Sequence, residues 1–157
     1  MKIMENTKNN VIITDIEKNE GIDGEIYVSS DYPLTEWYNV VRNKSISELN
    51  DSDISKFLRQ SLFLKYIVPE ALNRLREDPT IGELYCGEML TALYKVEDVF
   101  WKDNIALLKE AQNLLNELSE DSQVTINFEW LYEGEEREFH DKIKFFGEKL
   151  RRIEFNK

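Results

Sequence analysis

The sequence is poor in the residues that carry most protein chemistry. It has one cysteine, Cys86, and one histidine, His140, among 157 residues. A single cysteine excludes an intramolecular disulfide, and this pair, far apart in the chain, has no spacing typical of a zinc site. The six glycines never form a phosphate-binding loop of the Walker or dinucleotide-binding type. We therefore expect no metal and no cofactor.

Long hydrophobic runs are also missing. No stretch approaches the roughly 18 consecutive apolar residues that a membrane-spanning helix needs, and the segment from Met1 to Asn6 turns polar at once. Because nothing indicates a targeting segment or a need for disulfides, we expect a soluble, cytoplasmic protein that does not associate with membranes.

Basic residues are outnumbered. The chain has 20 lysines and arginines against 31 aspartates and glutamates, a net charge of −11 at pH 7. Such a field repels nucleic-acid phosphates and attracts basic surfaces, so direct nucleic-acid binding is disfavoured. Acidity also serves solubility, and by itself it names no partner.

The chain does contain enough hydrophobic residues to form a core. Hydrophobic residues make up 41% of the chain, and only three prolines interrupt it. A chain of this length buries roughly two-thirds of its unfolded surface as one domain. No internal repeat, low-complexity tract or change of composition indicates a second domain. We expect a single domain over 1–157, with 1–33 forming a hairpin or a mobile arm.

Helical spacing dominates the middle of the chain. Pro33 and Thr35 mark the start of a first helix ending near Asn43, and Asn50 with Asp53 resembles a capping box. The apolar positions from Ile54 to Tyr66 then predict a central helix. Pro69 should end or kink it and open the next helix at its first position. Apolar stripes predict further helices over 88–96 and from about 100 to 118.

Two regions show the alternation typical of strands. Residues 11–14 and 26–28 flank a turn-prone 21–24, and 124–130 alternate apolar with polar side chains, which predicts a strand near 124–132. Residues 135–153 have the spacing of a final helix, although part of this range also permits a returning strand. The predicted fold class is mainly α, a single-domain helical bundle-like core with a small β element.

The sequence shows no catalytic constellation. His140 is far more often a surface or capping residue than a general base, and Cys86 beside Gly87 is usually structural. Acidic side chains are dense between 129 and 138, but nothing in the sequence orients two of them as a glycosidase pair. We therefore predict that the protein is not an enzyme.

A series of local motifs between 34 and 101 resembles a known family. It comprises the runs 45–54, 58–60 and 64–72, then Leu75, Asp78-Pro79, the runs 82–85 and 87–90, and Phe100-Trp101. In this order they resemble the immunity proteins of bacterial contact-dependent growth inhibition (CDI) systems. The N-terminal arm and the segment after Ser119 fall outside the resemblance, and no toxin-contacting residue carries over from it.

The resemblance implies a protein that binds a cognate toxin C-terminal domain, often a nuclease, and neutralises it by covering its active or functional surface. An acidic field suits a cationic nuclease. The predicted toxin-binding residues are Glu129, Glu133, Glu135, Glu136 and Glu138. The alternative is a non-catalytic adaptor that binds a cellular protein, and the oligomeric state is open.

Three further residues are predicted to be structural, namely Arg59, Pro69 and Trp101. Arg59 lies in a mostly apolar helix, where a buried guanidinium must be paired to offset its desolvation. Its expected partner is an acidic residue such as Glu83 or Glu88.

Overall fold

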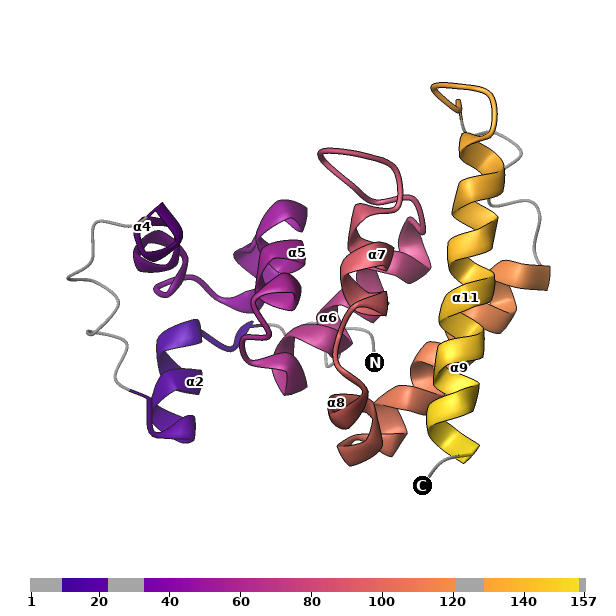
Figure 1. Cartoon of the computed structure of the whole chain (residues 1–157). Coiled ribbons are helices and arrows are strands. Elements are labelled where there is room, and N and C mark those ends of the chain that lie inside the picture. Colours follow the sequence, from indigo (N-terminus) through magenta and orange to yellow (C-terminus); the bar gives the residue numbers. More distant parts are fainter. Residues whose placement is uncertain (1–9, 23–32, 121–128, 156–157) are drawn as a thin grey trace, which may run out of the picture. The chain divides into compact units, whose positions relative to one another are not determined.

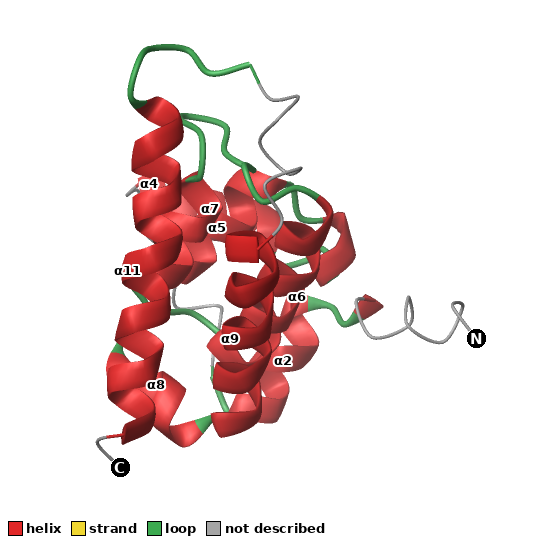
Figure 2. Ribbon diagram, turned by 90° about the vertical axis from the view of Figure 1, so that its right-hand side faces the viewer, coloured by secondary structure: helices red, strands yellow, loops and turns green. Residues whose placement is uncertain are grey.

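A computed structural model describes residues 10–22, 33–120 and 129–155 (Figure 1). Across these ranges the regular elements are helices, and the only β feature is an isolated bridge between Ile12 and Ser45 (Figure 2). The prediction of a mainly α fold is confirmed. The chain contacts divide into two compact units, residues 1–54 and 55–157, which are described in turn.

The first unit contains α2 (Ile13–Glu20), α4 (Pro33–Val41), the 3-10 turn η2 (Ile46–Glu48) and the start of α5 (Asp51–Arg59). The strand predicted over 11–14 is wrong, because α2 begins at Ile13. Ile13 and Ile16 are both fully buried, and their separation by three positions suits one face of a helix. Gly21 ends α2 in the left-handed conformation with φ 69°. The other predicted strand, 26–28, lies outside the described residues.

A polar cluster joins α2 to α4. The Arg42 guanidinium donates to both oxygens of the Glu17 carboxylate, at 2.6 and 3.1 Å, and the Tyr38 hydroxyl donates to it at 2.5 Å. Glu17 is buried, so its charge depends on these partners for compensation.

The capping box predicted at the start of α5 is confirmed. The Asp53 amide donates to Asn50 Oδ1 at 2.7 Å, and the Asn50 amide donates to Asp53 Oδ2 at 3.1 Å. The helix ends at Arg59, however, and not at Pro69 as predicted. Ser61 and Phe63 take positive φ values of 55° and 52°, which breaks the chain before the next helix.

The second unit continues with α6 (Leu64–Glu77), α7 (Glu88–Tyr94), α8 (Asp98–Asp103), α9 (Ile105–Glu120) and α11 (Glu135–Phe155). Pro69 lies inside α6 and does not open it, so the predicted helix boundary at Pro69 is wrong. The buried stripe from Ile67 to Leu75 runs across the proline, and its packing outweighs the one backbone hydrogen bond that a proline cannot make.

The core of the second unit forms where α11 packs on α7, α8 and α9, and where α6 packs on α7 and α9. Helices α9 and α11 lie side by side (Figure 2). Trp101 of α8 is fully buried and meets the rings of Phe100 and Phe146 edge-on, at centroid distances of 5.4 and 6.0 Å. The Lys149 ammonium group donates to the carbonyls of Tyr94 and Val96, which ties α11 to the α7–α8 connection.

The final helix is confirmed, and the alternative of a returning strand is wrong. The side chains spaced by four and three are all buried along α11, namely Phe139, Ile143, Phe146, Leu150 and Ile153. The strand predicted near 124–132 is not seen where the chain is described: 124–128 lie outside the described residues, and 129–132 are not extended into a strand.

Candidate functional site

The predicted acidic cluster lies at the N-terminal end of α11 and in the loop before it. Glu129, Glu133, Glu136 and Glu138 are exposed, whereas Glu135 is buried. Acidic groups in the first turn of a helix interact favourably with the positive end of the helix dipole, and this stabilisation of α11 explains part of the cluster structurally.

Two of the exposed carboxylates have partners. The Tyr132 hydroxyl donates to Glu138 Oε2 at 2.5 Å, and this hydrogen bond raises the pKa of Tyr132 to about 12. His140 Nε2 lies 3.9 Å from Glu136 Oε2, one helical turn away. No sequence pattern indicated that these carboxylates are oriented, because their partners belong to a loop and to the next helical turn.

A second loop, 82–87, precedes α7 at the same end of α7 and α11 as the acidic cluster (Figure 1). Lys142 of α11 places its ammonium group 4.9 Å from the centroid of the Tyr85 ring. A Cβ atom at Gly87 would lie only 3.3 Å from the ring of Phe139, so the loop backbone approaches α11 closely. Residues 83–85 and 129–138 therefore lie near the same end of α11, and together they are called here the α7–α11 face.

The α7–α11 face also exposes large apolar side chains that sequence reasoning did not select. They are Leu84, Tyr85, Leu131 and Tyr132. Each lies in a glycine-containing loop, where no helical or strand period requires an apolar residue. The occurrence of large apolar residues in these loops was the sequence signal that could have identified them.

Arg59 pairs as predicted. Its Nη1 lies 3.3 Å from Glu88 Oε2, and the other oxygen of the buried Glu88 carboxylate accepts the amides of Glu83 and Leu84 at 2.9 and 3.2 Å. The guanidinium is more exposed than expected, at 39%. Arg59 thus supports the 82–87 loop from outside, through Glu88.

Replacing Arg59 with alanine is expected to lower the free energy of unfolding by about 1 kcal/mol, a modest loss because water screens the exposed guanidinium. Thermal unfolding measures the change. Toxin affinity, corrected for the folded fraction, should change less, and Arg59→Lys should recover part of the stability. A variant that kept its stability but lost affinity would place Arg59 in the binding surface instead.

The Cys86 thiol has a raised pKa. Partial burial, followed by the charge of Glu135, raises its pKa to about 11. The thiol is therefore protonated at neutral pH, whereas the thiolate is the nucleophilic form. Among the residues with described positions, no three His, Cys, Asp or Glu side chains come together as a metal site.

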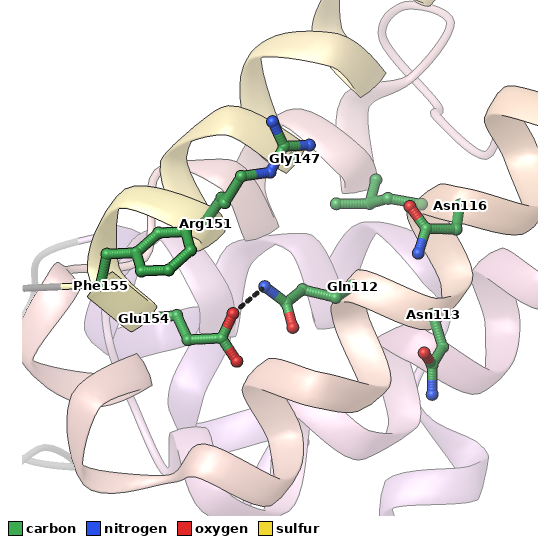
Figure 3. Close-up of a pocket in the computed structure, with 8 residues that line it drawn as sticks. Gln112, Asn113, Asn116, Gly147, Arg151, Glu154 and Phe155 are labelled. Atoms are coloured by element: carbon green, nitrogen blue, oxygen red, sulfur yellow. Dashed lines mark hydrogen bonds between the residues drawn. The ribbon is translucent and has the colours of Figure 1, made fainter.

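A groove of about 340 Å³ runs between α9 and α11 (Figure 3). Gln112 of α9 and Glu154 of α11 face each other across it, with Gln112 Nε2 donating to Glu154 Oε1 at 3.4 Å. Arg151 lines the same groove beside Gly147. Polar and apolar residues both line the groove, and they bring together no nucleophile with a base.

A helical scaffold that displays carboxylates together with exposed apolar side chains is typical of the class of proteins that bind other proteins. In the described ranges, no helix has the length and apolar character to cross a bilayer. The family model of CDI immunity proteins matches residues 19–111, which is more than half of the chain. The chain therefore belongs to the CDI immunity protein family.

The match confirms the resemblance found between 34 and 101 and extends it at both ends. Comparisons with curated proteins and with solved structures give no match. The family match includes the 82–87 loop and ends before the acidic cluster at 129–138. The α7–α11 face thus combines a segment inside the family match with one beyond it.

Proposed function

We propose that this protein binds a cognate CDI toxin C-terminal domain in the cytoplasm and neutralises it, without turnover, by covering the surface that the toxin needs. Membership of the immunity family supports this proposal most directly. The α7–α11 face supports it structurally, because it offers exposed carboxylates beside exposed apolar side chains. Apolar anchors surrounded by polar groups are typical of tight protein interfaces.

We propose further that the toxin is a nuclease. A nuclease must hold a phosphate backbone and therefore carries a basic surface around its active site. The net charge of −11 on this chain complements such a surface, and complementary fields raise association rates by about 10 to 10³-fold. The same field would repel the nucleic acid that competes for the cleft.

Within the cluster, Glu129, Glu133 and Glu136 are the carboxylates proposed to face the toxin. Glu138 contributes from a position fixed by its hydrogen bond with Tyr132. Glu135 supports the surface from beneath, because its buried carboxylate accepts the amide of Leu131 at 2.7 Å.

Reversing the charge of Glu129, Glu133 and Glu136 together, each to lysine, is expected to slow association with the toxin domain encoded beside this chain by about tenfold at low salt. Stopped-flow or surface-based kinetics measure the rate at several salt concentrations. The difference from the wild type should shrink as salt screens the charges.

A matched control reverses three exposed acidic residues on α8 and α9, Asp103, Glu110 and Glu117. It changes the net charge by the same amount at a different place. Slower association of the first variant alone supports the cluster as the contact surface, whereas equal rates in both variants would remove the cluster from the interface.

A further inference from the structure

The sequence contains the motif Leu-Tyr-X-Gly-Glu twice, and each copy ends on the first residue of a helix. Residues 84–88 lead into α7, and residues 131–135 lead into α11. Five residues are far fewer than a repeat unit of roughly 20 or more, so the motif does not indicate a repeat architecture. The structure shows that the two copies also share a conformation.

Both copies fold into the same turn. The glycines, Gly87 and Gly134, take positive φ values of 79° and 97°. In each copy the glutamate amide donates to the tyrosine carbonyl at 3.2 Å. The glutamate side chain then accepts the amide of the leucine, at 3.2 Å for Glu88 and 2.7 Å for Glu135. Both carboxylates are buried, so each turn is held from below by a fixed acceptor.

The turns hold their leucine and tyrosine side chains out to solvent. Leu84 and Tyr85 are 79% and 46% exposed, and Leu131 and Tyr132 are 83% and 53% exposed. The core does not need these side chains, and the buried glutamates fix the backbone that carries them. Rigid presentation lowers the entropy that an apolar anchor loses when it binds a partner.

The two turns belong to one surface. The buried ring of Phe139 lies close to both of them. A Cβ atom built on Gly87 of the first turn would lie 3.3 Å from this ring, and the ring centroid is 5.8 Å from that of Trp130, the residue directly before the second turn. Lys142, which lies over the Tyr85 ring, comes from the same helix as Glu135. The exposed leucines and tyrosines of both turns therefore belong to the α7–α11 face.

The charge near the two turns indicates which kind of partner can bind them. Glu83, Glu133 and Glu136 are exposed, and each lies within one of the two motifs or next to it in the sequence. A second copy of this chain would bring these carboxylates against their own equivalents, which disfavours self-association. A basic surface with an apolar centre fits both features at once.

We infer that the twin Leu-Tyr turns are the central anchors of the toxin interface, where they enter an apolar patch that lysines and arginines surround on the toxin. This inference rests on the proposed function and adds to it the residues that supply most of the affinity. Anchors of this kind act mainly by slowing dissociation, whereas the flanking carboxylates act on association.

The test replaces Leu84 and Leu131 together with serine and measures binding of the toxin domain encoded beside this chain. The control replaces Val99 and Phe155, which are 56% and 79% exposed and lie outside both turns. We expect the Leu84→Ser, Leu131→Ser variant to bind about 100-fold more weakly through faster dissociation. The control should bind as the wild type does, and thermal unfolding should show both variants folded.

Three results would overturn the inference. Affinity of the leucine variant within about threefold of the wild type would place the anchors elsewhere while leaving the proposed function intact. An equal loss in the control would show that exposed apolar area in general, and not the turns, governs binding. A wild-type dimer in light scattering, dissolved by the leucine substitutions, would assign the turns to self-association. Failure of the wild type itself to bind the toxin would instead refute the proposed function.

Discussion

Replacement of Trp101 by alanine is expected to lower the free energy of unfolding by about 3–5 kcal/mol, the range for removing a large aromatic side chain from a core. Trp101 has no exposed surface. It joins α8 to α11 through its edge contact with Phe146, whose ring in turn meets Tyr94 of α7 at 5.7 Å. The alanine variant leaves a cavity where three helices meet.

Urea unfolding followed by circular dichroism measures this loss. Trp101→Phe provides the matched control, because a phenyl ring fills much of the cavity and should retain more than half of the lost stability. A loss below about 1 kcal/mol for Trp101→Ala would contradict the structural role assigned to this side chain.

Replacement of Arg42 by leucine is expected to cost a similar amount, about 3–5 kcal/mol, because it leaves the buried Glu17 carboxylate without its cation. Burial alone would raise the pKa of Glu17. The hydrogen bonds from Arg42 and Tyr38 and the charge of Arg42 outweigh that effect and hold the pKa below its usual 4.5. The wild-type pair therefore stabilises the fold above pH 4.5, and this contribution is lost as the pH falls through the lowered pKa of Glu17.

Two measurements check the second prediction. The stability difference between wild type and Arg42→Leu should be largest near pH 7. It should shrink as the pH falls and be smallest below the lowered pKa of the wild-type Glu17, where this carboxyl is protonated in both proteins. Adding Glu17→Leu to Arg42→Leu should restore part of the stability, since no buried charge then remains uncompensated. A double variant as unstable as Arg42→Leu alone would show that the loss comes from packing and not from charge.

The parts of the fold that local chemistry decides were predictable. The capping box of Asn50 and Asp53 needs only four residues of sequence, and the buried stripe of α11 repeats over about four turns. The break between α5 and α6 was not predictable in this way. The apolar pattern continues through it, and the positive φ values of Ser61 and Phe63 depend on how the flanking helices pack.

The wrong prediction of a strand over 11–14 has a similar cause. The β-branched residues near Ile12 indicated a strand, but only the pairing of Ile13 with Ile16 on a buried face shows the helix. At the candidate site, the acidic cluster was visible in the sequence, whereas the burial of Glu135 was not. Comparison of the two Leu-Tyr-X-Gly-Glu motifs could have indicated it, because Glu88 has the same role in the other copy.

The family was recognisable from sequence because its motifs are caps, turns and a proline at fixed spacing between 34 and 101. The contacts with a toxin were not, because binding surfaces depend on which side chains from separate loops meet. The α7–α11 face brings together residues more than forty positions apart, and only the packing of α11 on α7 places them side by side.

The most direct test of the account is a titration of the cognate toxin's activity with the purified protein. Neutralisation by binding predicts that activity falls in proportion to the added protein and ends near equal molar amounts. Longer incubation should not deepen the inhibition, and toxin recovered after denaturation and refolding should be active again. Progressive loss of toxin activity at a small fraction of the toxin concentration would mean turnover, and would contradict inhibition by occlusion.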